Sequence, residues 1–327
     1  MENLTALFCD LDRKYFQLQR KKCGKMRAYF LRCPIMFKKA LFILSLCPSF
    51  ALAQSYVVYD FTHNRVLESH ASDSIQPIAS VTKLMTANVF LENNKNPNCR
   101  IAITKEDTDR IKGTGTKLPK NIPISCNELL KAMLVHSDNY AAHALSRAAG
   151  ISRRQFINKM NEKAHQLGMY STRFHDSSGL SSYNISSPMD LVKLAKYSLN
   201  KSDIKRLSNL SATYIQAGKH KLYIKNTNKL VRDEIFDAAV NKTGYIQESG
   251  YNLVFINKHL CKNATIGVIS LNNTSSAYRS SFTKSKLEKF GCTALNGRTI
   301  RDVAGEAQYE DGYDEVGFNT LIQQLSK

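Results

Sequence analysis

Three short segments of this chain carry side chains that together could perform acyl transfer to a serine. The first contains Ser80 and Lys83, the second is Ser137-Asp138-Asn139, and the third is Lys242-Thr243-Gly244. A serine hydroxyl attacks a carbonyl carbon when a neighbouring base takes its proton, and an amine can be that base. Ser-x-x-Lys recurs elsewhere in the chain. The order and spacing of all three segments, rather than any one of them, therefore indicate this chemistry.

The first motif begins a stretch with helical periodicity. Its apolar residues have the spacing that gives a helix one buried face: Val81, Leu84, Met85 and Val89. Residues three apart on a helix are neighbours, so the Lys83 amine should reach the Ser80 hydroxyl. Lys83 must be neutral to act as a base. Its pKa must therefore fall by about 3 units from the reference value of about 10.4, which costs on the order of 4 kcal/mol. Burial and a second cation both lower such a pKa, and Lys242 is the candidate cation.

The second motif lies between two apolar helical patterns, at residues 129–134 and 141–145. A junction of two helices can direct a hydroxyl and a carboxamide into a cleft. Ser137 would then pass a proton to a leaving amine, and Asn139 would hold a substrate amide. Ser, Asp and Asn are also the residues preferred at a helix N-cap, so a cap without chemistry is the alternative.

The third motif begins a predicted strand at residues 241–246, which a turn at residues 248–250 joins to a second strand. An extended segment beside the nucleophile can lie along a peptide substrate. Lys242 and the Thr243 hydroxyl would meet a carboxylate, and Gly244 would let two backbones approach closely. An ordinary edge strand with an exposed lysine is the alternative.

With this order and these separations, the motifs resemble those of the low-molecular-mass penicillin-binding proteins. These are D-alanyl-D-alanine carboxypeptidases and endopeptidases that share a fold with the serine β-lactamases. The resemblance covers about residues 55–295, and it includes the segments 156–174, Ser178-Gly179-Leu180 and Asn226-Thr227-Asn228.

The resemblance implies a role for each matching residue. Ser80 would be the acylated nucleophile, Lys83 its base, and Ser137 a further catalytic residue. The backbone N–H groups of Ser80 and Tyr245 would form the oxyanion hole, in which each donor is worth roughly 3 to 4 kcal/mol. The residues that would bind substrate are Asn139, Lys242, Thr243 and Gly244. The family implies no cofactor, and it implies peptidoglycan peptides as substrates and β-lactam antibiotics as covalent inhibitors.

Two features refine the expected activity. The first predicts slow turnover of β-lactams, and the second predicts cleavage of peptidoglycan cross-links. Residues 165–168 lack the Glu-x-x-Leu-Asn pattern that supplies the deacylating glutamate of class A β-lactamases. Residues 242–250 and the short segment after Cys292 resemble the penicillin-binding protein seven type, periplasmic DD-endopeptidases that cut 4,3 cross-links. Asn241 departs from that pattern, because serine is expected before Lys242. A DD-carboxypeptidase and a non-catalytic peptidoglycan-binding protein are the alternatives.

The distribution of strand and helix patterns predicts an α+β fold. Two probable strands, Ser55–Asp60 and Arg65–Ser69, lie near the start of the chain. Three more are predicted near the end, at residues 241–246, 251–259 and 264–271, and helical patterns fill much of the interval. We expect the DD-peptidase-like fold, an antiparallel five-stranded sheet packed with helices and carrying an inserted, mainly helical subdomain. The catalytic domain would span residues 54–295, and a short tail residues 296–327.

Residues 36–53 are typical of a secretory signal peptide, with two lysines, an apolar run at residues 40–46 and small residues before the cleavage site. We predict cleavage after Ala53, a periplasmic location and no stable transmembrane anchor after cleavage. Since Met36 precedes this signal, residues 1–35 would be an upstream extension outside the fold. The alternatives are an uncleaved anchor with a basic cytoplasmic extension and a lipoprotein attached at Cys47.

Cleavage would leave four of the eight cysteines and reduce the net charge. The even set of cysteines allows two disulfides in an oxidising compartment, Cys99–Cys126 and Cys261–Cys292, with four free thiols as the alternative. The net charge of +19 would fall to +12, with 36 basic and 24 acidic residues remaining. A basic surface favours an anionic polymer such as the cell wall, and export disfavours nucleic acid as a partner.

Two other features are expected to carry no chemistry. Residues 113–117, Gly-Thr-Gly-Thr-Lys, imitate a phosphate-binding loop without its full pattern, so an ordinary loop is predicted. His136 and His143 flank the second motif without a matching set of ligands, so no metal site is predicted.

Overall fold

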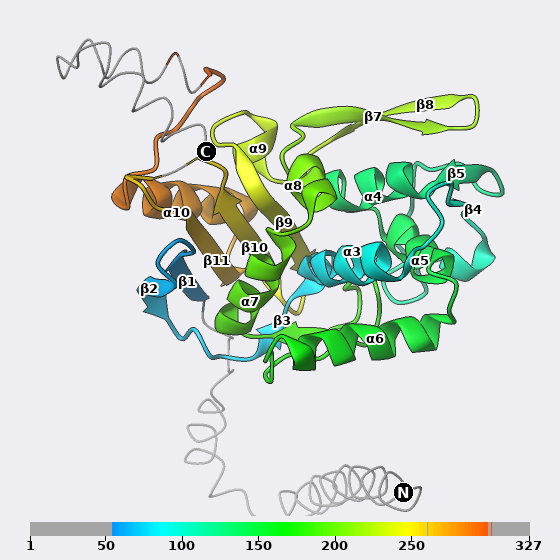
Figure 1. Ribbon diagram of the computed structural model, residues 1–327, viewed down its shortest axis with the longest axis horizontal. Helices are drawn as coiled ribbons and strands as arrows, with labels where there is room; N and C mark the ends of the chain where they lie inside the picture. Colours follow the sequence, from blue (N-terminus) through cyan, green and yellow to red (C-terminus); the bar gives the residue numbers. More distant parts are fainter. Residues whose placement is uncertain (1–53, 260, 300–301, 303–327) are drawn as a thin grey trace, which may run out of the picture. The chain divides into compact units, whose positions relative to one another are not determined.

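The computed structural model describes residues 54–259, 261–299 and 302 (Figure 1). The predicted extension and signal peptide, residues 1–53, lie outside the described residues, as does most of the predicted tail. No helix within the described ranges is both long enough and apolar enough to cross a membrane.

The central sheet is built from both ends of the described chain, as predicted. Its strand order is β2-β1-β11-β10-β9, and all neighbouring pairs are antiparallel. The strands are β1 (Ser55–Asp60), β2 (Arg65–His70), β9 (Ala238–Ile246), β10 (Gly250–Asn257) and β11 (Ile266–Asn273). The last three differ from the predicted bounds by one to three residues, which is the usual error where strands fray into turns. The sheet confirms the α+β architecture.

The sheet separates two apolar cores because side chains alternate between its faces. On one face Val58, Phe255 and Val268 pack with Leu287 of α10 (Ser276–Lys289). On the other face the alternate residues of the same strands, including Val57 and Val254, join the larger core that the inserted helices complete. α7 (Pro188–Ser198) covers β1, β10 and β11 on this second side (Figure 1).

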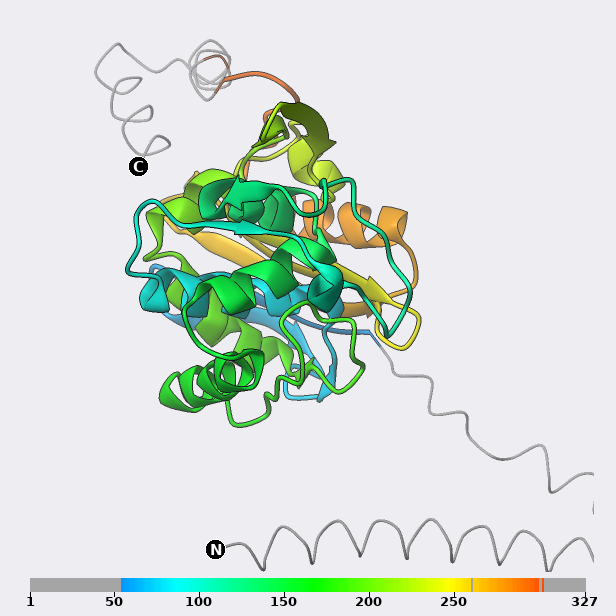
Figure 2. The same cartoon turned by 90° about the vertical axis from the view of Figure 1, so that its right-hand side faces the viewer.

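The segment between β2 and β9 forms the predicted, mainly helical insertion (Figures 1 and 2). Its remaining helices are α3 (Thr82–Asn93), α4 (Cys126–Val135), α5 (Asn139–Ala148), α6 (Arg153–Gln166), α8 (Ser202–Ser208) and α9 (Lys229–Arg232), with the 3-10 turns η2 (Ala79–Val81) and η3 (Lys105–Asp107). Three two-stranded sheets pair β3 (Gln76–Pro77) with β6 (Ile185–Ser186), β4 (Arg100–Ala102) with β5 (Pro123–Ser125), and β7 (Ala212–Ala217) with β8 (His220–Lys225).

Side-chain caps define where most of these helices begin. Ser125, Asp138, Ser152 and Ser187 each accept a hydrogen bond from a backbone N–H group in the first turn that follows. α3 has no side-chain cap, because the turn η2 runs directly into it. The Ser80 hydroxyl, in the turn η2 just before α3, does not cap that helix.

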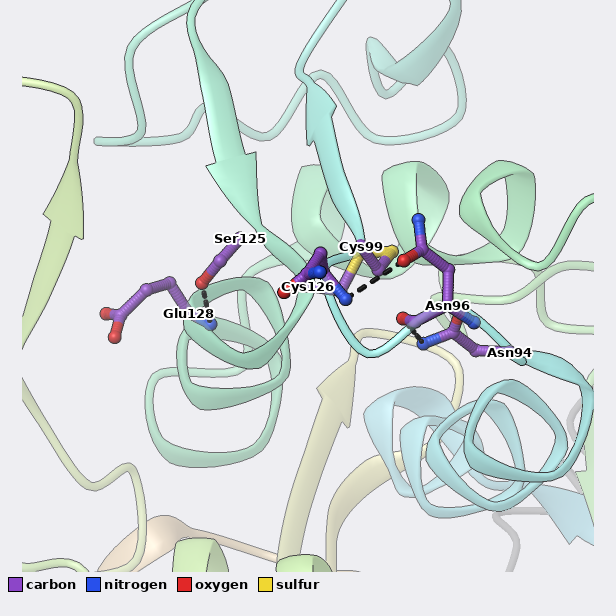
Figure 3. The surroundings of a disulfide bond; sticks show 7 residues. Asn94, Asn96, Cys99, Ser125, Cys126 and Glu128 are labelled. Atoms are coloured by element: carbon purple, nitrogen blue, oxygen red, sulfur yellow. Dashed lines mark hydrogen bonds between the residues drawn. A yellow bond between two sulfur atoms is a disulfide. The ribbon is translucent and has the colours of Figure 1, made fainter.

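Two disulfides join the four cysteines in the pairs predicted, Cys99–Cys126 and Cys261–Cys292. Their Cα atoms lie 5.4 and 4.2 Å apart. Cys126 is the first residue of α4, and its N–H also donates to the carbonyl oxygen of Cys99. Figure 3 shows this bond beside the Ser125 cap, so one cross-link fixes both the β4–β5 pair and the start of α4.

Candidate active site

The turn that carries Ser80 is strained and tightly enclosed. Ala79, directly before the serine, has φ of 48°, a left-handed conformation that L-alanine rarely adopts. A Cβ atom at Gly179 would lie 1.9 Å from the carbonyl oxygen of Ala79, and one at Gly244 would lie 2.7 Å from that of Ile78. Both glycines are therefore required where their backbones touch this turn, and together they fix the direction of the serine.

Lys83 lies one turn after Ser80, and its amine is completely buried. Its Nζ atom is 2.7 Å from Ser80 Oγ, 2.7 Å from Asn139 Oδ1 and 2.5 Å from the carbonyl oxygen of Ser178. The contact predicted from helical spacing is therefore present, although Ser80 itself belongs to the 3-10 turn and α3 begins at Thr82.

Burial lowers the pKa of Lys83 to about 7. The charges of Asp176, Asp138 and Asp109 raise this pKa, but by less than burial lowers it. Burial first, and then the charge of Lys83, hold the pKa of Lys242 well below its usual value. Repulsion between two amines acts on both, so the pair is consistent with the expected second cation beside Lys83.

The second motif is both a helix cap and part of the site. Asp138 caps α5 by accepting a hydrogen bond from the N–H of Ala141, and it also accepts one from the Thr116 hydroxyl. Ser137 has φ of 64°, so the chain turns sharply here. This turn directs Ser137 toward Lys242 and Asn139 toward Lys83, while Asp138 stays buried between them.

The third motif lies on β9, the edge strand of the sheet, beside η2. Lys242 Nζ donates to Ser137 Oγ at 2.9 Å and to the carbonyl oxygen of Thr243 at 2.9 Å. The Thr243 hydroxyl is 2.6 Å from that of Thr227. Lys242 is therefore buried rather than an exposed edge lysine, and its contact with Ser137 connects the second and third motifs.

Tyr245 follows Gly244 on β9 and pairs with Tyr251 of β10. Its ring is half exposed and lies against the ring of Tyr251, with 4.4 Å between the ring centroids. The Tyr245 backbone therefore lies on the strand that approaches Ser80, next to the glycine that nearly touches the Ser80 turn.

A family model described as D-alanyl-D-alanine carboxypeptidase matches residues 48–275 of this chain. The chain belongs to this family. A D-alanyl-D-alanine endopeptidase from Haemophilus influenzae is 99% identical over 292 residues, which cover 89% of this chain and 100% of that relative. Relatives of the same description from Escherichia coli and Pseudomonas aeruginosa are each 32% identical, over 61% of this chain and 65% of the relative.

Solved structures show the same fold. The Streptomyces K15 DD-transpeptidase superposes with a TM-score of 0.65 at 27% identity, covering 72% of this chain and 95% of that chain. A penicillin-binding protein homologue from Mycobacterium tuberculosis, 21% identical, has a TM-score of 0.64 and supports the fold alone.

The departure from the family pattern at Asn241 has a structural reason. Asn241 is buried, accepts a hydrogen bond from Asn228 Nδ2 at 2.8 Å and donates one to Asn226 Oδ1 at 3.1 Å. The Asn226-Thr227-Asn228 segment is thereby tied to the start of the Lys242 strand. This network places Thr227 against Thr243.

The loop that supplies the Ser178 carbonyl belongs to the family resemblance, but its sequence did not predict a contact with Lys83. Asp176 organises this loop by accepting hydrogen bonds from the N–H groups of Ser178, Gly179 and Ser181 at 2.6 to 2.8 Å. The available signal was the sequence Asp-Ser-Ser-Gly, in which an aspartate precedes a glycine that needs a left-handed conformation.

Sequence reasoning also assigned residues 113–117 to an ordinary loop without chemistry. The segment is a loop, yet the Thr114 hydroxyl accepts a hydrogen bond from Asn139 Nδ2, and Thr116 braces Asp138. His143 lies near the Asp107 carbonyl, and within the described part of the chain no group of three or more His, Cys, Asp or Glu could hold a metal ion.

Gly179→Ala should disable the site by shifting the Ser80 turn. The new Cβ would meet a backbone oxygen at 1.9 Å, and the residue would keep φ of 87°. We expect a loss of about 3 kcal/mol in the free energy of unfolding and a fall in penicillin acylation of at least a hundredfold.

Urea unfolding and the rate of labelling by a fluorescent penicillin measure these effects. Gly150→Ala is the matched control, because Gly150 also has a positive φ, 75°, and an added Cβ atom there would meet nothing within 4 Å. Equal stability and labelling of the two variants would show that the close approach at Gly179 does not matter.

Proposed function

We propose that this chain is a serine DD-peptidase that hydrolyses D-alanyl peptide bonds of peptidoglycan through an acyl-enzyme on Ser80. The observation that carries the proposal is the fully buried Lys83 amine, with a pKa of about 7, at 2.7 Å from the Ser80 hydroxyl. Burying an amine lowers the stability of a fold. Its contact with a serine hydroxyl that does not cap a helix therefore supports a pair of base and nucleophile.

In the first step Lys83 takes the Ser80 proton while Oγ forms a bond to the carbonyl carbon of the substrate. The carbonyl oxygen then becomes an oxyanion, which the backbone N–H groups of Ser80 and Tyr245 would stabilise. The proximity of β9 to the Ser80 turn supports this role for Tyr245, because a Cβ at Gly244 would lie 3.1 Å from the Ser80 nitrogen.

In the second step the tetrahedral intermediate expels the amine of the scissile bond. That amine needs a proton, and Ser137 would deliver it from its own hydroxyl. The proton that Lys83 took from Ser80 would replace it on Ser137, so Lys83 becomes neutral again, while Lys242, 2.9 Å from Ser137 Oγ, holds that hydroxyl in place. Water then attacks the ester carbonyl as Lys83 takes one of its protons, and this proton returns to Ser80 Oγ when the ester bond breaks.

The substrate would lie along the edge of β9 as an added strand. Lys242, Thr243 and Gly244 would contact it there, with the Thr243 hydroxyl available to a carboxylate, and Asn139 would contact its peptide amide. In the unliganded site Asn139 uses both ends of its carboxamide, for Lys83 and Thr114, so a substrate amide would share these contacts. β-lactams would acylate Ser80, and the resulting acyl-enzyme would be hydrolysed slowly.

Within this chemistry we propose endopeptidase action on cross-links. The 99% identical relative described as D-alanyl-D-alanine endopeptidase supports this choice, as do the two relatives at 32% identity. A carboxypeptidase is the second candidate, because the matching family model and a Bacillus subtilis relative at 28% identity are described as D-alanyl-D-alanine carboxypeptidases.

We also propose that the chain is exported to the periplasm and cleaved after Ala53, with a catalytic domain at residues 54–295 and a short tail at residues 296–327. The start of β1 at Ser55 and the two disulfides, which form in oxidising compartments, support this proposal. The 292 residues aligned to the Haemophilus influenzae relative equal the length from Met36 to the end of the chain, which supports an extension at residues 1–35.

Digestion of purified muropeptides tests the activity. We expect the enzyme to convert cross-linked dimers to monomers faster than it removes terminal D-alanine from pentapeptide monomers. Ser80→Ala should abolish both reactions and covalent labelling by penicillin, because no oxygen remains to be acylated. Ser281→Ala is the control, because Ser281 begins another Ser-x-x-Lys, is exposed and lies on α10 outside the proposed site.

Loss of terminal D-alanine without dimer cleavage would replace the endopeptidase by a carboxypeptidase. Penicillin labelling that persists in Ser80→Ala would remove Ser80 as the nucleophile.

The pH dependence of penicillin acylation tests Lys83 as the base. Its pKa of about 7 means that the amine is protonated below this pH and cannot accept the Ser80 proton. The second-order rate constant should therefore fall about tenfold per pH unit below pH 7 and level off above it. Stopped-flow labelling from about pH 5 to about pH 9 measures the profile. A rate that stays constant through pH 7 would contradict the assignment.

The amino terminus of the exported protein tests the processing proposal. Mass spectrometry of periplasmic material should give Gln54 as the first residue, since cleavage follows small residues such as Ala51 and Ala53. Material that begins at Met1 or Met36 would mean that the signal is not removed.

A further inference from the structure

We propose that Asp109 and Thr114 are positioning residues that set the direction of the hydrogen bonds around Lys83, so that the lone pair of its amine faces Ser80. The inference rests on the proposed function in one respect, that neutral Lys83 is the base. It adds a requirement that neither the three motifs nor the family description contains, a directional chain of hydrogen bonds from the loop at residues 109–114.

The neighbours of Lys83 decide where its lone pair points. A neutral amine has two hydrogens and one lone pair, and Nζ has three close partners, Ser80 Oγ, Asn139 Oδ1 and the Ser178 carbonyl oxygen. A backbone carbonyl and an amide oxygen only accept hydrogen bonds. They therefore take both hydrogens of the amine, and the lone pair is left for the hydroxyl hydrogen of Ser80.

This arrangement depends on which end of the Asn139 carboxamide faces Lys83. If the amide rotated by half a turn, its NH₂ group would donate to the lone pair and compete with Ser80 for it. The base would then be blocked although every residue of the motif remained in place. Asn139 must therefore be held with Oδ1 toward Lys83 and Nδ2 on the opposite side.

Thr114 holds the carboxamide in this orientation. Its Oγ1 accepts a hydrogen bond from Asn139 Nδ2 at 2.9 Å, while its own hydrogen goes to Asp109 Oδ2 at 2.6 Å. A rotated amide would place Oδ1 against Thr114 Oγ1. Since the only hydrogen of that hydroxyl is already donated to Asp109, two acceptors would then face each other.

Asp109 makes the direction of the chain unambiguous, because an ionised carboxylate can only accept. It is buried, and its oxygens also accept from the N–H groups of Ile111, Lys112 and Thr114 at 2.7 to 3.0 Å. Burial raises the pKa of Asp109, but these hydrogen bonds and that of the Thr114 hydroxyl outweigh it and lower the pKa below its usual value. The carboxylate thus stays ionised wherever the enzyme is active.

Thr114→Val tests the chain with a side chain of the same shape. We expect the limiting rate of penicillin acylation at high pH to fall about tenfold to a hundredfold, because Asn139 is free to rotate and block the base. Thr114→Ser keeps the hydroxyl and should restore the rate to within about threefold of the wild type. Thr213→Val, on the remote β7 strand, controls for the substitution itself.

The pH at which the acylation rate begins to fall, the acid limb of the profile, distinguishes a rotated Asn139 from a loosened loop. A rotated Asn139 removes an acceptor from the ammonium form of Lys83 and adds a donor to the neutral form, so in Thr114→Val the limb should move to lower pH. A loosened loop that lets water reach Lys83 would weaken burial and move the limb to higher pH. A limb that stays in place or moves up would overturn the inference.

Asp109→Asn, made alone and in the Thr114→Val background, tests whether the two residues act in one chain. Alone it should lower the limiting rate, whereas in the Thr114→Val background it should lower that rate by less than twofold further. Independent, multiplied losses would overturn the inference. If wild-type labelling is abolished by Ser80→Ala but unchanged by Thr114→Val, the proposed function stands and the positioning chain is wrong.

Discussion

Removal of the Lys83 amine from water is the constraint on which the rest of the site depends. An amine that is buried without a contacting carboxylate prefers to be neutral, and here burial brings its pKa to about 7. Near neutral pH the unfolded chain holds this proton and the folded chain tends to lose it, which costs on the order of 4 kcal/mol of folding free energy. The two cores on either side of the sheet have to offset this cost. The result is a neutral amine that can act as a base beside Ser80.

The topology explains how three distant segments meet around that amine. The insertion leaves the sheet after β2 and passes through β3 into η2 and α3, so Ser80 and Lys83 lie where the helical part joins the sheet. The chain returns to the sheet as β9, an edge strand beside η2. The α4–α5 junction then closes the remaining side through the contact of Ser137 with Lys242. One side of β9 stays without a partner strand among the described residues, which suits a peptide.

The sequence was sufficient for the architecture and the motif residues, because these depend on local patterns. Alternating strands and helical spacing each have a short-range signature, and the Ser80 to Lys83 contact follows from spacing alone. The rest depends on tertiary packing. Nothing local to Ser178 or Thr114 indicates their contacts with Lys83 and Asn139, because those partners are 95 and 25 residues away in the sequence.

Left-handed backbone at two non-glycine residues, Ala79 and Ser137, has a consequence for how this family can change. Ala79 directly precedes Ser80, and Ser137 is itself a residue of the site; each conformation costs about 1 to 2 kcal/mol that the surrounding structure must supply. The most stable sequence for this fold would relax both turns and lose the directions in which Ser80 and Asn139 point. Selection for thermal stability alone would therefore erode the active site first, so stability and activity are under opposed selection at these turns.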